Sequence, residues 1–456
     1  RPLAKPLIQG TSLFSFAVAK VVHFLKIPTI RSNFSSFLFS SHYTLHASHP
    51  SIALSHNRLR NLHMDYHFLL SGGKKHKFPI RSGQYTTVTG LPINIINKDH
   101  PIELDIYDIV DSISYIPLET SEKCLLGELL RTKRDGDFYF VEDAKGLFVF
   151  GKDGRFLNEI GHKGNAPGEY LYMDNFYLDR KNKQVCIINN VQKRILRYAY
   201  DGTYASVSYL EDKDANIESA MLCDGGELLA FYPLPNDLFH VDSEYRVFRE
   251  EGDTFVSERI MDAKALTTKD AFYPFLYFPM VTFNNKHFLA SVFSNELYQY
   301  EKGKAFPVYH VDASATIPDE AFLDEHKDLD FFELLKIMSQ QNISMGITAL
   351  EASSDYLFAL IDNRRTLVWD GEKGILVSTT YNSDLNLYSS LLTGGSSDEH
   401  VGYLSAEFFC DKKEDSAGSK TLSELADSLS EDDNPVLFQY HFKKGAVKSL
   451  MEKYKL

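Results

Sequence analysis

A few oxygen-bearing side chains could hold a metal ion. Four of them are the candidate ligands: Asp174, Asn175, Asp224 and Asn236. Hard cations such as calcium bind clusters of carboxylate and amide oxygens. If these side chains converge, they could hold calcium or another divalent cation, with His162 or His240 beside it as a general base. Each residue also suits a turn or a solvent-facing position, so both interpretations stay open.

A second group of side chains could line a binding rim: Lys163, Asn190, Tyr232, Phe293, Asn295, Asn363 and Arg365. Polar residues recur at equivalent points between the second and third strands of a repeated unit: Asn189-Asn190, Ser294-Asn295 and Asp362-Asn363-Arg364-Arg365. Aromatic faces and amide groups suit a glycan or a peptide, and an envelope protein is a further partner for such a rim. The competing explanation is that Asn and Asp are good turn residues.

The sequence lacks the motifs of several common catalytic classes. It contains no G-x-S-x-G nucleophile motif, no P-loop and no G-x-G-x-x-G that opens a helix after a strand. The cysteines at 124, 186, 223 and 410 lie far apart without a Cys-x-x-Cys pair, so we expect buried free thiols, or one or two disulfides if the protein is exported, rather than a zinc site. We therefore expect no catalytic residues and no cofactor.

Charge divides the chain at about residue 98. Residues 1–98 contain 12 Lys and Arg and one acidic residue, a net charge of +11, whereas residues 99–456 contain 36 Lys and Arg and 61 Asp and Glu, a net charge of −25. The acidic body argues against nucleic acid as a partner, because nucleic acid is a polyanion. The aromatic residues, 26 Tyr, 33 Phe and 1 Trp, favour strands.

The basic segment 1–98 is predicted to be a disordered, targeting or spurious upstream tail, followed by a linker over 99–111. Its most apolar stretch, 11–30, is interrupted by Lys20, His23 and Lys26, so we expect no transmembrane segment. A signal peptide with an A-x-A cleavage site at 17–19 and an organellar transit peptide are open alternatives.

The acidic body repeats a unit of four short strands. The clearest copy has strands over 127–133, 138–141, 147–150 and 155–160, and the next has strands over 175–179, 185–188, 194–198 and 204–210. Asp153-Gly154 and Asp201-Gly202 mark the last turn of each copy, which is a strong hairpin signal. Looser copies follow. A period of about 40–50 residues with four strands indicates a β-propeller.

The ends of this repeat are predicted to close a ring. The run 113–118 has no sheet of its own, and the last unit, with runs at 384–392, 400–405 and 436–442, lacks a fourth strand. Pairing the two would remove both unpaired edges. We therefore predict an all-β chain, a six-bladed β-propeller over residues 112–443, in which the N-terminal strand closes the last blade, with a C-terminal tail over 444–456.

Three segments resemble known propellers. The sequence GHKGNAPGEY at 161–170 resembles the joint of NHL-type repeats, and residues 116–120 and 434–437 resemble the start and end of a six-bladed propeller family of Bacteroidetes. The resemblance covers about residues 105–443. It implies an exported, periplasmic or cell-envelope protein of a largely uncharacterised family. The stretch 69–74 resembles the surroundings of a lipobox but lacks the required cysteine, and the sequence shows no clear signal peptide.

Long insertions are expected on one face of the propeller, over 252–276, 312–344 and 381–398. Apolar residues recur at helical spacing between 322 and 338, and 422–429 is a further predicted helix. These segments could form a lid or a partner-binding rim, or could cover a hydrophobic edge.

The sequence thus favours a non-catalytic ligand- or protein-binding module. The alternatives are a metal-dependent hydrolase or lyase, resembling a lactonase or esterase, with a cation on the propeller axis, and a scaffold without a small ligand.

Overall fold

Short apolar runs separated by tight turns fold into antiparallel meanders, in which each strand pairs with the next along the chain. The first consists of β5 (Leu129–Asp135), β6 (Phe138–Asp143), β7 (Leu147–Gly151) and β8 (Phe156–Glu159). The two middle strands are buried on both faces, as their continuous apolar runs predict.

The computed structural model describes residues 89–456, apart from 214, 233–242, 263–275, 277, 314–315, 327, 330, 363, 386, 394–399 and 412–419.

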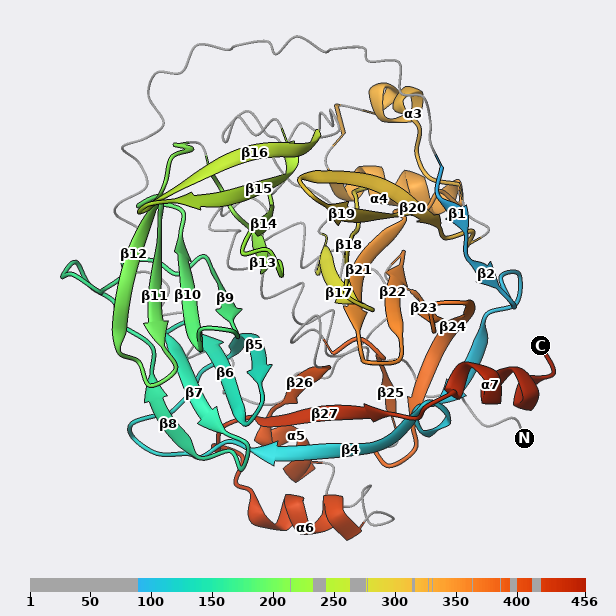
Figure 1. Cartoon of the computed structure of the whole chain (residues 1–456). Coiled ribbons are helices and arrows are strands. Elements are labelled where there is room, and N and C mark those ends of the chain that lie inside the picture. The colour runs from blue at the N-terminus through green and yellow to red at the C-terminus, as the bar shows by residue number, and fades with distance from the viewer. Residues whose placement is uncertain are drawn as a thin grey trace. The chain divides into compact units, whose positions relative to one another are not determined.

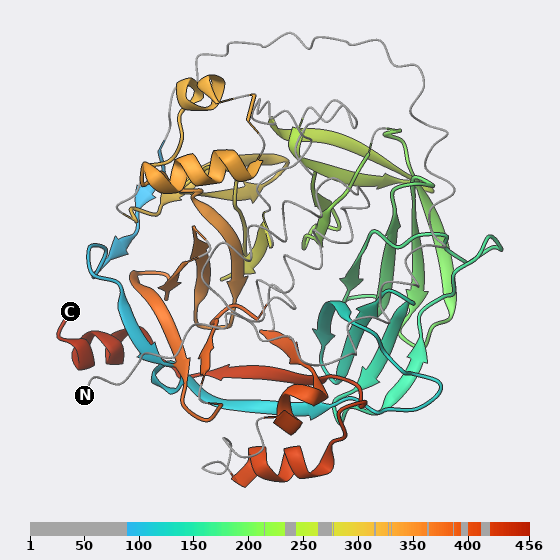
Figure 2. The same ribbon diagram turned by 180° about the vertical axis from the view of Figure 1, so that it is seen from behind.

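Four more meanders follow the same order, and they confirm the predicted four-stranded unit. Their strands are β9 (Asn175–Asp179), β10 (Gln184–Asn189), β11 (Arg194–Ala199) and β12 (Tyr204–Leu210); β13 (Ser219–Leu222), β14 (Leu228–Phe231), β15 (Ser243–Glu251) and β16 (Thr254–Asp262); β17 (Met280–Phe283), β18 (Lys286–Leu289), β19 (Glu296–Glu301) and β20 (Lys304–His310); β21 (Ile347–Ala352), β22 (Leu357–Ile361), β23 (Arg365–Trp369) and β24 (Lys373–Asn382). First strands of neighbouring meanders contact each other, as β9 contacts β13 and β17 contacts β21. The sheets thus follow one another around a centre (Figure 1, and from behind in Figure 2).

The predicted closure of the ring is confirmed. β4 (Val110–Pro117) pairs antiparallel with β27 (Val436–Phe442), from Pro117↔Val436 to Val110↔Phe442. β27 also pairs with β26 (Val401–Leu404), whose neighbour on the next meander is β5. Strands from the two ends of the described chain therefore share one sheet (Figure 1).

The expected number of six blades is wrong when blades are counted as separate sheets of at least four strands. The described residues form five hydrogen-bonded sheets, of which four reach that size, and the closing sheet β26–β27–β4 has three strands. Two meanders that we expected as separate blades form one eight-stranded sheet, because the outer strands β12 and β16 pair in parallel at Tyr209↔Thr254 and Leu210↔Phe255. The fold is therefore all-β and propeller-like, with four such blades.

An N-terminal strap lies along the outside of two meanders. Its strands β1 (Leu91–Pro92), β2 (Asn94–Ile95) and β3 (Ile102–Asp105) pair in parallel with the outer strands β20 and β24, and the short 3-10 helix η3 (Ile106–Asp108) leads into β4. The segment 99–111, expected as a linker, thus contains β3, η3 and the start of β4. Most of the basic segment 1–98 lies outside the described residues.

Helices occupy two of the chain segments where we expected them. α3 (Glu320–Glu325) and α4 (Phe331–Gln340) lie between β20 and β21, and α6 (Lys420–Ser428) follows α5 (Ala406–Asp411) between β26 and β27. Leu334 and Met338 of α4 are buried in the largest hydrophobic cluster, so this helix covers apolar surface. The C-terminal segment forms α7 (Ala446–Tyr454).

Two expected insertions differ from the structure. Residues 254–262 form β16, where we expected the start of the insertion 252–276. Within 381–398 the described residues include β25 (Leu387–Ser389), which pairs with β24. Among the helices of the described residues, none is long and apolar enough to cross a membrane.

Candidate functional site

The structure uses two of the predicted metal ligands in hydrogen bonds, one within a meander and one between neighbouring meanders. Asp174 Oδ2, just before β9, accepts a hydrogen bond from the backbone N–H of Asn190 (2.7 Å), and burial raises the pKa of the Asp174 carboxyl. Asn175 Nδ2 donates to the carbonyl of Glu218 on the next meander, and its Oδ1 accepts from the amide of Phe176 (2.7 Å). These bonds order the start of β9.

The other candidate ligands lie apart from this pair. Asp224 follows β13, whereas the start of β13 is the end that contacts β9, so Asp224 lies at the opposite end of the strands. His162 Nδ1 is 3.3 Å from Glu159 Oε2 on an exposed turn, while Asn236 and His240 lie outside the described residues. In the part of the chain that the structure describes, no three His, Cys, Asp or Glu side chains are grouped to hold a metal ion.

Three predicted rim residues donate to backbone carbonyls. The side chain of Asn190 exchanges two hydrogen bonds with the backbone of Ile217, at 2.9 and 3.0 Å. Arg365 donates to the carbonyl of Ala313 (2.7 Å). Lys163 Nζ donates to the carbonyl of Ala144 (2.6 Å) and remains exposed to solvent.

The remaining rim residues that the structure describes are buried. The ring of Tyr232 stacks on Phe248 at 6.5 Å between centroids, and the guanidinium of Arg246 lies over it at 5.5 Å. Phe293 and Asn295 are also buried, at 3% and 5% exposure. Asn363 lies outside the described residues. The polar groups of Asn190 and Arg365 thus bond to the backbone, whereas Asn295 Oδ1 is buried without a hydrogen-bond partner in the described residues.

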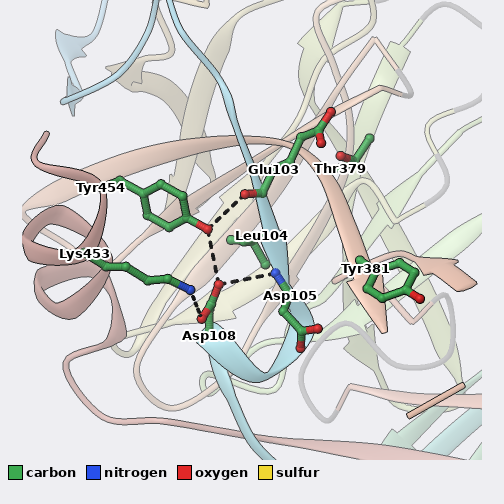
Figure 3. Close-up of a pocket in the computed structure, with 8 residues that line it drawn as sticks. All are labelled: Glu103, Leu104, Asp105, Asp108, Thr379, Tyr381, Lys453 and Tyr454. Atoms are coloured by element: carbon green, nitrogen blue, oxygen red, sulfur yellow. Dashed lines mark hydrogen bonds and ion pairs between the residues drawn. The ribbon is translucent and has the colours of Figure 1, made fainter. Parts of the chain in front are cut away.

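A pocket that the sequence analysis missed lies between the strap, β24 and α7. It is an open hollow of about 390 Å³, a volume within the usual range for ligand sites. Eight residues line it: Glu103, Leu104, Asp105, Asp108, Thr379, Tyr381, Lys453 and Tyr454. Figure 3 shows the Glu103 side chain extended toward Thr379 and the Asp105 carboxylate beside Tyr381.

Two elements fix the acidic wall of the pocket. Asp105 caps η3, because its Oδ1 accepts from the amide of Tyr107 (2.9 Å) while Asp108 Oδ2 accepts from the amide of Asp105 (3.3 Å). From α7, Lys453 Nζ lies 2.5 Å from Asp108 Oδ1, and the Tyr454 hydroxyl donates to the carbonyl of Glu103 (3.0 Å). The C-terminal helix therefore holds the strap in place at the pocket (Figure 3).

The electrostatics of the pocket favour a positive occupant. Three carboxylates and one ammonium group line the pocket, and the hydrogen bond with Asp108 raises the pKa of Lys453, so that this ammonium stays charged and paired. Burial raises the pKa of Tyr454, which keeps its hydroxyl a donor. Within the described residues, the Glu103 carboxylate forms no ion pair and the buried Thr379 Oγ1 has no hydrogen-bond partner.

The sequence contained only a weak signal for this pocket. The alternation Ile102-Glu103-Leu104-Asp105 is typical of a strand with one polar face, but it lies in a segment that we expected to be a linker. Asp108 and Lys453 are 345 residues apart, so only the folded ring brings them together.

Comparison with known proteins gives a family and a fold. The family model described as "Domain of unknown function (DUF4934)" matches residues 91–441. A crystal structure of a "Putative exported protein" from Bacteroides fragilis is 20% identical, with a TM-score of 0.60 over 75% of this chain and 99% of that one. A DUF4221 family member from Bacteroides vulgatus is 8% identical, with a TM-score of 0.40 over 74% and 98% of the two chains. No curated protein matches the sequence.

Proposed function

The chain belongs to the DUF4934 family, and from this premise we propose that it is a non-catalytic recognition module of the cell envelope. Its ligand carries a positive group, such as the ammonium or guanidinium of a peptide side chain. The site is the pocket between β3, β24 and α7.

The charge balance of the pocket is the observation that carries this proposal. Its one ammonium, Lys453 Nζ, is already paired with Asp108, whereas the carboxylates of Glu103 and Asp105 line the pocket without an ion pair in the described residues. A cation placed there gains charge-assisted hydrogen bonds. The ring faces of Tyr381 and Tyr454 can add cation–π attraction.

The side chains that line the pocket support binding rather than catalysis. Acidic and aromatic groups line it, and in the described residues its only basic group is held in an ion pair on α7. The location in the envelope is supported by the resemblance to Bacteroidetes propellers and by the description of the Bacteroides fragilis protein.

Titration calorimetry on the full chain tests the proposal. The probes are a tri-lysine amide and the same peptide with acetylated side chains. We expect the first to bind and the second to bind at least about 10-fold more weakly, because acetylation removes the positive charge. The variant E103Q should weaken tri-lysine binding about 2- to 5-fold, the effect of an exposed ion pair worth about 0.5–1 kcal/mol.

The matched control is E431Q, which removes an exposed carboxylate that does not line the pocket. Equal binding of both peptides, or unchanged tri-lysine binding by E103Q, would refute the proposal. A parallel thermal-shift series with calcium and EGTA examines the alternative. Stabilisation by calcium without binding of tri-lysine would favour a cation site instead.

A further inference from the structure

Half of the large apolar side chains that are exposed in the described residues lie around the joint between β8 and β9. They are between 37% and 60% exposed and form what we call the joint patch: Leu125, Leu171, Tyr172, Val191 and Tyr204. Single exposed apolar residues are normal on a soluble protein. A group of them indicates an interaction surface.

Hydrogen bonds hold the first part of the patch together. Lys145 Nζ donates to the carbonyl of Leu125 (2.5 Å), and Lys163 Nζ donates to the carbonyl of Ala144 (2.6 Å), the residue before Lys145. Lys163 also forms a parallel β-bridge with Tyr170, at the end of the joint. These contacts place the loop that carries Leu125 beside the joint.

Further contacts add the rest of the patch. The hairpin that carries Val191 is bonded to the start of β9, because the amide of Asn190 donates to Asp174 Oδ2 (2.7 Å). Tyr172 lies two residues before that aspartate. The ring of Tyr204 lies against the backbone of the joint.

The basic side chains of this surface lack acidic partners. Lys145, Lys163 and Arg194 each donate to a backbone carbonyl, and in the described part of the chain none of the three forms an ion pair. The nearby carboxylate of Glu169 turns back and accepts from the amide of Ala166 (2.8 Å). The partly exposed carboxylate of Glu159 lies 3.3 Å from His162 Nδ1. The surface thus presents three basic side chains without acidic partners beside apolar ones.

We propose that the joint patch docks a segment of a partner protein in which acidic residues alternate with aromatic or aliphatic ones. The carboxylates would pair with Lys145, Lys163 and Arg194, while the apolar side chains would cover Tyr172 and Val191. Charge complementarity and apolar contact select the same occupant. This surface is separate from the pocket and calls for a ligand of opposite charge.

Fluorescence anisotropy on the full chain tests the inference. The probe is a labelled peptide of Asp and Glu alternating with Phe, Leu and Tyr, and its counterpart carries Lys in place of every acid. We expect the acidic peptide to bind and the basic one not to bind to this patch. The double variant Y172S/V191S should weaken binding of the acidic peptide about 5-fold or more. K163Q should weaken it about 2- to 5-fold, and added salt should weaken it further.

The control is F306S, which removes an exposed ring on β20 outside the patch. Binding that is the same in the wild type and in Y172S/V191S overturns the inference, as does failure of the acidic peptide to bind. Light scattering tests whether a second copy of this chain covers the joint patch instead. Self-association that Y172S/V191S abolishes would make that copy the partner and would also overturn the inference. Neither result affects the tri-lysine test of the pocket.

Discussion

At the scale of single residues, the polar groups at the strand ends mostly stabilise the junctions between meanders. Asn190 shows why: its side-chain amide accepts from and donates to the backbone of Ile217, so it bonds the hairpin between β10 and β11 to the segment before β13. An Asn that binds a ligand and an Asn that bonds two meanders together have the same sequence pattern. Only the distances in the folded chain separate them, and that is why sequence predicted the positions of these residues but not their roles.

The turn glycines give a sharper prediction at this scale. Gly154 has φ +79°, and a Cβ there would lie 2.0 Å from the carbonyl oxygen of Pro117 on β4. We expect G154A to lower the free energy of unfolding by about 2–4 kcal/mol, from backbone strain and overpacking together. Urea denaturation measures it. In G226A, at φ +82° with no atom within 4 Å, only the strain of about 1–2 kcal/mol should remain. Equal losses in both variants would contradict the close contact.

At the scale of elements, salt bridges and hydrogen bonds connect neighbouring meanders. Asp135 at the end of β5 accepts from Lys183 Nζ (2.6 Å) and from the Tyr200 hydroxyl (2.8 Å) of the next meander. Burial alone would raise the pKa of Asp135, but these donors outweigh it, and the pKa lies below its ordinary value.

This lowered pKa predicts a pH-dependent contribution to stability. Because the folded-state pKa is below the unfolded value of about 3.9, the stabilisation is present above that pH and is lost as the pH falls through the folded-state pKa. We expect D135N to be less stable than the wild type by about 1–2 kcal/mol at pH 7, with the difference shrinking toward pH 2. Urea denaturation across this range measures it. D137N, which removes an exposed partner of Lys152, should change little; a pH-independent loss in D135N would contradict the assignment.

At the scale of the whole molecule, closure of the ring depends on strands from both ends of the described chain. Deleting residues 436–456 removes β27 and leaves β4 without its partner. We expect this truncation to abolish cooperative unfolding, as followed by circular dichroism in urea. Deleting only residues 446–456 removes α7 but keeps β27, and should retain a cooperative transition at a lower midpoint. Cooperative unfolding of the longer deletion at the wild-type midpoint would contradict the closure.

The repeat and its closure could be predicted from sequence, because each depends on local patterns such as Asp-Gly turns and apolar runs of strand length. The blade count and the strap could not be predicted in the same way. The pairing of β12 with β16 covers only two residue pairs, and β1 and β2 have two residues each, too few to show a period. The pocket depends on this strap and on α7, so it was missed for the same reason.

A crystal structure of the full chain with a lysine-containing peptide tests whether the pocket binds a positive group. We expect an ammonium group within hydrogen-bonding distance of the carboxylate of Glu103 or of Asp105, in the pocket that Tyr381 and Tyr454 also line. A peptide bound at the strand ends near Asp174 instead, with the pocket empty, would contradict it.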